Sequence, residues 1–200
     1  MSEPRIGRIL VASMHQAIAE LLPSRIEFYE TWLTSTGLRE GSIGVGPLSA
    51  VLSFLRLEAG SAYNQTTTRA GEYAGEWTVN TMSPLERRVF LALPAPLRAR
   101  AAMRVARSLV TSTYPGSRAI VKVQGGAASV ALRGSLFCEV REASALPLCG
   151  FYAAAFGQVL TRFGLPADVQ VHQCRAAGSR QDCQLGVVLA ATPQAPSAAA

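Results

Sequence analysis

Lysine is almost absent from this chain, and charged residues as a whole are scarce. Lys122 is the only lysine among 19 basic residues, so arginine supplies the formal net charge of +6. Charged residues make up 16% of the sequence, against a usual value of about 25%. A chain with so little charge has much apolar surface to bury, which favours an apolar ligand cavity or a dimer interface.

Other absences exclude whole classes of protein. No stretch approaches the roughly 18 uninterrupted apolar residues of a membrane span. His15, Gln16 and Glu20 interrupt the N-terminal apolar stretch 9–22, so it is not a secretory signal, and we expect a cytoplasmic protein. In that compartment, cysteines are more often buried, metal-bound or reactive than disulfide-bonded. Basic residues without interleaved aromatics argue against nucleic-acid binding.

Motifs for redox cofactors are also missing. No G-x-G-x-x-G follows a predicted strand, and the glycines at 44–46 and 125–126 form segments too short for one. No acid–base pair is evident either, since His15 lies among helix residues. We therefore expect no nucleotide cofactor and favour a protein that is not an enzyme.

The first part of the chain, residues 1–113, has the pattern of helices. We expect helices over 9–22, from Ser24 (with Glu27 in a capping box) to Gly37, from Pro47, over 62–82, from Ser83, and from Pro96 to Thr113. Small residues at 70, 71, 74 and 75 permit close packing of another helix, our favoured interpretation, or of a flat ligand. The arginines at 98, 100, 104 and 107 indicate a solvated face or, alternatively, a patch for an anionic partner.

In residues 114–190 the spacing of apolar residues changes from a helical pattern to one that is typical of strands. Strands are predicted over 119–123, 128–132 and 136–140, then a helix over 148–163, then strands over 169–174 and 183–189. The composition of the tail 191–200 predicts disorder. At 200 residues the whole chain fits an α+β fold, with helices packed on an antiparallel sheet in a single domain.

Three of the four cysteines lie in the last quarter of the chain. Cys149 precedes a predicted helix, and Cys183 opens the strand that pairs with the one ending at Cys174. His172 is two residues before Cys174, so on a regular strand both side chains point to the same face. Cys149, His172, Cys174 and Cys183 would then form a Cys3His zinc site of structural type. No C-x-x-C is present, and the alternative is four small buried residues.

These cysteine segments also resemble a known family. Cys149-Gly-Phe-Tyr-Ala-Ala-Ala-Phe, Cys174-Arg-Ala-Ala-Gly and Cys183-Gln-Leu are similar to the 4-vinyl-reductase-like domain, in particular its bacteriochlorophyll 4-vinyl reductase-type members. That family is related to TRAPP vesicle-tethering subunits and to the ligand-binding domains of phenol-sensing activators. The resemblance implies an α/β plait, an apolar pocket, a homodimer and bound zinc. It places a glutamate ligand where this chain has Val171, so His172 is expected to substitute.

The predicted function follows from the apolar excess and from the resemblance. We expect a binding or accessory protein for a small apolar ligand, by resemblance a tetrapyrrole of (bacterio)chlorophyll biosynthesis. Aromatic side chains that could line its pocket, or simply pack in the core, are Tyr73, Trp77, Phe151, Tyr152 and Phe156. One alternative is a non-catalytic sensor or adaptor acting through a dimer or a partner protein. The other is a 4-vinyl reductase enzyme, as the family name implies.

Overall fold

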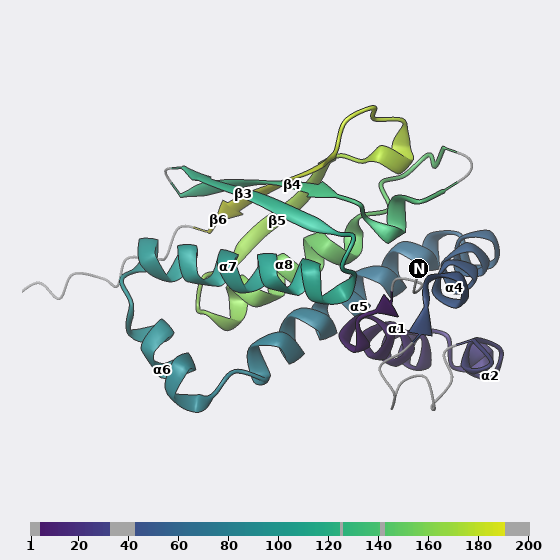
Figure 1. The fold of residues 1–200 in the computed structure, drawn as a ribbon, viewed down its shortest axis with the longest axis horizontal. Coiled ribbons are helices and arrows are strands. Elements are labelled where there is room, and N and C mark those ends of the chain that lie inside the picture. The colour runs from purple at the N-terminus through teal and green to yellow at the C-terminus, as the bar shows by residue number, and fades with distance from the viewer. Residues whose placement is uncertain (1–4, 33–42, 125, 141–142, 191–200) are drawn as a thin grey trace, which may run out of the picture.

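Helices cover one face of a four-stranded antiparallel sheet and leave its other face open (Figure 1). The computed structural model describes residues 5–32, 43–124, 126–140 and 143–190. The sheet has the order β3-β4-β6-β5, with strands β3 (Arg118–Gln124), β4 (Ala127–Arg133), β5 (Ala167–Gln173) and β6 (Cys183–Leu189). The predicted α+β class is confirmed.

Helices α7 and α8 lie against the sheet and α5 packs on α8, whereas α1, α2 and α4 extend beyond one end of the sheet (Figure 1). The long helices are α1 (Arg8–Leu21), α4 (Val45–Ala59), α5 (Ser61–Asn80), α7 (Ala95–Thr113) and α8 (Gly150–Arg162). The shorter elements are β1 (Arg5–Ile6), η1 (Pro23–Arg25), α2 (Ile26–Glu30), β2 (Ile43–Gly44), α6 (Pro84–Ala92), η2 (Leu136–Cys138) and η3 (Arg175–Ala177). No helix in the described part of the chain is both long enough and apolar enough to cross a membrane.

Local sequence signals explain several helix boundaries. Pro23 follows the end of α1, and Ser83 begins α6 with a complete capping box. In that box the Glu86 backbone N–H donates to the Ser83 hydroxyl at 3.2 Å, and the Ser83 N–H donates to the Glu86 carboxylate at 2.9 Å. The capping box predicted at Ser24 is wrong, because Ser24 lies inside the 3-10 turn η1. Residues 33–37 of that predicted helix and the tail 191–200 lie outside the described residues.

The predicted strand 136–140 is also wrong. Leu136, Phe137 and Cys138 form the 3-10 turn η2, and all three side chains are buried. A strand exposes alternate residues on opposite faces, so three consecutive buried residues suit a turn folded into the core. Strand β4 forms a hairpin with β3 and pairs on its other side with β6, where Leu132 lies opposite Cys183.

Helices α5 and α8 pack backbone to backbone. A methyl group at Gly71 would overlap the carbonyl oxygen of Phe151, and one at Gly75 would lie 2.7 Å from the carbonyl oxygen of Ala155. The small residues of α5 therefore serve close helix packing, which confirms the favoured interpretation of that segment.

We predict opposite effects for two glycine-to-alanine substitutions. Gly71→Ala should lower the free energy of unfolding by about 1–3 kcal/mol, because the added methyl group forces α5 and α8 apart. Gly157→Ala is the matched control on α8: its methyl group meets Val169 at an ordinary 3.7 Å, so the variant should gain about 0.5–1 kcal/mol. Urea denaturation measures both, and equal stabilities would contradict the packing described here.

Candidate metal centre and ligand groove

Four cysteines from four separate parts of the chain converge on one point. Cys138 ends η2, Cys149 is the residue before α8, Cys174 follows β5, and Cys183 begins β6. All four are free and buried, with at most 7% of any side chain exposed. The cluster therefore brings together parts of the chain that are up to 45 residues apart in the sequence.

The sulfur atoms are spaced for a tetrahedral metal ion. Cys138 Sγ lies 3.0 Å from Cys149 Sγ and 3.4 Å from the sulfur atoms of both Cys174 and Cys183, and Cys149 lies 3.9 Å from Cys174. A tetrahedron with bonds of about 2.3 Å from zinc to sulfur has sulfur–sulfur edges of about 3.8 Å. A disulfide requires about 2.05 Å, so the four thiols are in the range of metal ligands and outside that of disulfides.

Backbone N–H groups and one hydroxyl surround the sulfur atoms. The Leu148 N–H donates to Cys174 Sγ and the Arg175 N–H to Cys183 Sγ, each at 3.3 Å. The Cys149 thiol donates to the Ser135 hydroxyl oxygen at 3.8 Å. Backbone donors such as the two N–H groups orient metal-bound thiolates and stabilise their negative charge. The cluster can therefore bind a metal ion.

The four thiols do not ionise alike. Hydrogen bonds from Cys138 and then Cys149 lower the pKa of Cys174 and of Cys183. Hydrogen bonding to Cys138, followed by contact with the other two thiols and by burial, raises the pKa of Cys149. Like charges at this distance disfavour each other's ionisation, so all four thiols can ionise together only when a cation lies between them. A divalent ion would supply that charge.

His172, expected as the fourth ligand, does not reach the cluster. Val171 pairs with Leu185 and Gln173 with Gln184, so His172 is the extra residue of a register irregularity in β5. Its ring lies over Gly186, where a Cβ would overlap it, and the side chain is exposed. The bulge interrupts the alternation of side chains, so His172 and Cys174 do not share a face as a regular strand would require.

Cys138 takes the fourth position instead, and the sequence interpretation missed it. The error follows from the predicted strand 136–140, because only the turn η2 directs the Cys138 side chain toward the other three cysteines. Val171, where the sequence resemblance predicts a glutamate ligand, lies on β5 and lines the groove described next. The signal that could have identified Cys138 as a ligand was its presence as a fourth cysteine upstream of the other three.

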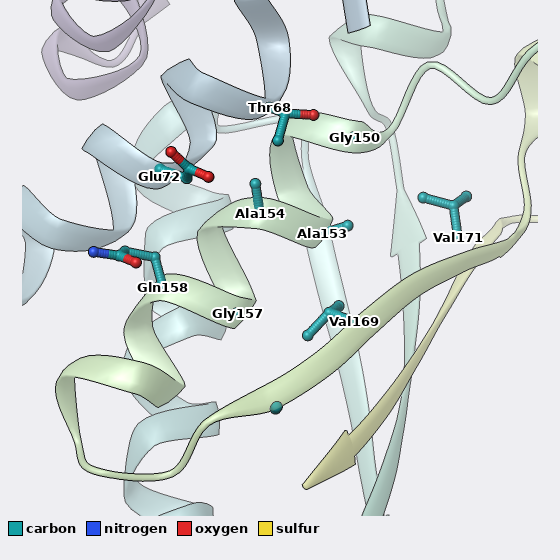
Figure 2. Close-up of a pocket in the computed structure, with 10 residues that line it drawn as sticks. Thr68, Glu72, Gly150, Ala153, Ala154, Gly157, Gln158, Val169 and Val171 are labelled. Atoms are coloured by element: carbon teal, nitrogen blue, oxygen red, sulfur yellow. The ribbon is translucent and has the colours of Figure 1, made fainter. Parts of the chain in front are cut away.

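A groove of about 430 Å³ runs between α8, α5 and the edge strand β5 (Figure 2). Residues without large side chains on α8 form its floor, valines of β5 form one wall, and polar residues of α5 and α8 form its rim. Its lining residues are Thr68, Glu72, Gly150, Ala153, Ala154, Gly157, Gln158, Ala167, Val169 and Val171. Its size falls within the range of about 300–1,000 Å³ that is typical of small-molecule sites.

The cluster lies at one end of this groove. Cys149 immediately precedes α8, and Cys174 immediately follows β5. The spacing between the two walls therefore depends on how these two cysteines are held. A second cavity of about 730 Å³ lies between α4 and residues 139–140, 143–144 and 148, with Arg56 and Glu139 among its lining residues.

The five aromatic residues proposed for a pocket lie elsewhere. Phe151, Tyr152 and Phe156 are fully buried in the core, where Phe137 stacks on Phe151 with ring centroids 4.9 Å apart. Burial raises the pKa of Tyr152 to about 12. None of the five lines either cavity described above.

Tyr73 and Trp77 stack on each other on α5, at the surface beside α1. The Tyr73 hydroxyl and Arg69 both donate to the Glu20 carboxylate, which links α5 to α1. The Arg69 hydrogen bond is the main cause of the lowered pKa of Glu20. These two aromatic residues therefore belong to a contact between helices.

Comparison with known proteins identifies the fold. No family model and no curated protein sequence matches the chain. Among solved structures, the phenol-responsive sensory domain of the transcription activator PoxR, crystallised with phenol, is 14% identical, with a TM-score of 0.56 over 72% of this chain and 74% of that one. An Fe(II) unliganded H-NOX protein mutant from K. algicida is 11% identical, with a TM-score of 0.59 over 94% of this chain and 98% of that one.

The chain therefore shares the fold of a phenol-sensing domain, one of the relatives that the sequence resemblance implied. Membership of the 4-vinyl-reductase-like family stays a prediction.

We predict that Cys138 matters for metal binding and His172 does not. Cys138→Ser should weaken Zn²⁺ binding by more than the 10- to 100-fold typical of changes around a metal's ligands, as should Cys174→Ser, because each removes a thiolate. His172→Ala should retain the metal. Competition with a chromophoric chelator gives the affinities. A metal-free His172→Ala protein alongside a metal-bound Cys138→Ser protein would contradict the ligand set.

Proposed function

We propose that this protein is a small-ligand-binding domain of sensor type, in which one zinc ion links the two walls of the ligand groove. The observation that carries the proposal is the position of the cysteines: Cys149 begins the helix on one side of the groove, and Cys174 ends the strand on the other. Ligand binding in the groove and structural support from zinc would then depend on the same elements, α8 and β5.

Zinc is the metal that suits these ligands best. Four thiolates in a tetrahedral arrangement are typical of structural zinc or iron–sulfur sites, and this cluster fits one ion with no bridging sulfide. Zinc bound there would neutralise thiolate charge and cross-link η2, α8, β5 and β6. With all four positions filled by protein, its role is structural.

The groove favours an apolar ligand with one polar group. Val169, Val171 and the small residues of α8 offer apolar contact, while Thr68 and Gln158 provide hydrogen-bonding groups at the rim (Figure 2). Glu72 is the one ionisable side chain among the ten lining residues, and Arg69 pairs with it at 2.9 Å. This favours binding over acid–base catalysis, so we rank the vinyl reductase last.

Two ligand classes follow from what is similar to this chain. The shared fold of the phenol-responsive domain favours a small aromatic ligand. The sequence resemblance favours a tetrapyrrole, the larger of the two classes. A sensor role would also need an output, for which the predicted homodimer or a protein partner remains our proposal.

We expect a side chain placed in the groove to block binding. Gly157→Leu should weaken the binding of a small aromatic probe by about ten- to a hundredfold, since overpacking costs about 1–3 kcal/mol. Gly157→Ala adds one methyl group and is the matched control, with nearly unchanged affinity. Isothermal titration with phenol and fluorescence quenching with protoporphyrin IX distinguish the two ligand classes. If neither probe binds, or if both variants bind like the parent, the groove is not the ligand site.

Metal removal should affect the groove as well as stability. Zinc binding to the metal-free protein should release protons, because Cys149 has a raised pKa and must lose its proton to coordinate; the affinity should therefore rise with pH. Stripping the ion with a chelator should lower the melting temperature and weaken probe binding together. Restored zinc reverses both effects. If the metal-free protein bound the probe with unchanged affinity, ligand binding in the groove would not depend on the metal at the cluster.

A further inference from the structure

Helix α6 and the start of α7 form a corner with an exposed apolar surface. α6 lies away from the sheet, on the opposite side of the molecule from α2 and α4 (Figure 1). Leu85 is 72% exposed, Val89 54% and Leu97 49%. α6 contains no buried residue along its length. Such exposure of large apolar side chains in one place indicates a surface that another molecule covers.

The orientation of α6 is set by contacts on its inner side. The Phe90 ring packs edge-to-face on Phe163, which follows α8, with centroids 5.7 Å apart. Arg98 of α7 donates to the Leu91 carbonyl oxygen at 3.0 Å, near the end of α6. The capping box at Ser83 stabilises the other end. The corner is thus held in place while its outer side has no cover among the described residues.

The outer side of α6 follows helical spacing. Leu85, Arg88, Val89 and Ala92 stand at positions i, i+3, i+4 and i+7, and all four are exposed. They lie on one face of the helix, so apolar and basic groups are presented together. This is the reverse of an ordinary surface helix, which turns its apolar face to the core.

Helix α7, which follows α6, carries a row of exposed arginines. Leu97, Arg100, Arg104 and Arg107 share its exposed face, and the arginines extend over roughly 10 Å along the helix. No salt bridge to these three arginines occurs within the described residues. Residues 84–113 contain six arginines and one glutamate, which gives +5 of the chain's net +6.

We propose that this corner binds the surface of an anionic lipid bilayer. Leu85, Val89 and Leu97 would enter the headgroup region, and the arginines of α7 would contact lipid phosphates. A second copy of the chain would bring the same positive charge against this one, so self-association through the corner is disfavoured. Nucleic acid would leave the exposed leucines without apolar contact. This proposal stands independently of the ligand groove.

Shape and charge distribution favour a bilayer over an acidic protein. Leu85 and Val89 belong to α6, which projects at one end of the molecule, and the three arginines belong to α7, which runs back from that end (Figure 1). A bilayer presents a continuous anionic surface and deforms around an inserted corner, whereas a protein partner would need a matching hollow. An acidic protein partner is the competing outcome of the test below.

The test is co-sedimentation of the full chain with lipid vesicles. We expect binding to vesicles of phosphatidylcholine with 30% phosphatidylglycerol, little binding to phosphatidylcholine alone, and loss of binding as salt is raised. Replacing Arg100, Arg104 and Arg107 together by Gln should weaken binding about a hundredfold, at about fivefold for each arginine near an anionic surface. The matched control replaces Arg8, Arg118 and Arg180, which are exposed elsewhere, by Gln and should bind like the parent.

The apolar contribution is tested separately. Leu85→Ser with Val89→Ser should reduce vesicle binding at least about tenfold, whereas Leu146→Ser, at an exposed leucine elsewhere, should not. Circular dichroism verifies the fold of each variant, and these side chains are too exposed to be needed for it. No binding to anionic vesicles, or equal loss in both arginine triples, would overturn the proposal. The first result would favour an acidic protein partner, the second a nonspecific charge effect.

Discussion

The constraint on which the rest of the structure depends is the burial of four thiols within contact of one another. Cys138, Cys149, Cys174 and Cys183 come from four different parts of the chain, and their sulfur atoms lie too far apart for disulfides and too close together for four independent charges. A divalent metal ion, as proposed above, would resolve that conflict, because it would offset the thiolate charge and leave the hydrogen bonds from Leu148 and Arg175 in place.

Helix α8 has small residues on two sides, and each side serves a different purpose. On the side of α5, the carbonyl oxygens of Phe151 and Ala155 touch Gly71 and Gly75 of that helix, so no space remains. On the side of β5, Ala153, Gly157 and Val169 line the groove, and a methyl group at Gly157 would fit there at 3.7 Å from Val169. The edge strand β5, which leads into the cluster at Cys174, leaves this groove beside α8, while α5 approaches α8 until the backbones meet. Small residues thus produce a contact in one direction and a cavity in the other.

The sequence predicted those features that depend on local chemistry. Neighbouring residues alone determine the capping box at Ser83, the end of α1 before Pro23, and the hairpins that join β3 to β4 and β5 to β6. Three cysteines were also correctly expected to converge, because paired strands and a helix start bring them together. Cys138 was missed because a β-branched and apolar segment was interpreted as a strand, although tertiary packing buries all of η2. His172 was misplaced because a bulge in β5 leaves no mark in the sequence. The aromatic residues of α8 were assigned to a pocket because composition does not distinguish a cavity lining from a packed core.

One helix connects the cysteine cluster, the groove and the exposed corner. The residue before α8 belongs to the cluster, the middle of α8 lines the groove, and Phe163 after its last turn supports Phe90 of α6, whose outer face carries Leu85 and Val89. α8 has 13 residues and spans about 20 Å, and its contact with α5 leaves no gap in which it could bend independently. A ligand that separates α8 from β5 must therefore displace the helix as a unit or strain the cluster at its start. Under the proposed function, a shift of α8 would carry Phe163 with it, and Phe163 is the residue on which Phe90 of α6 packs.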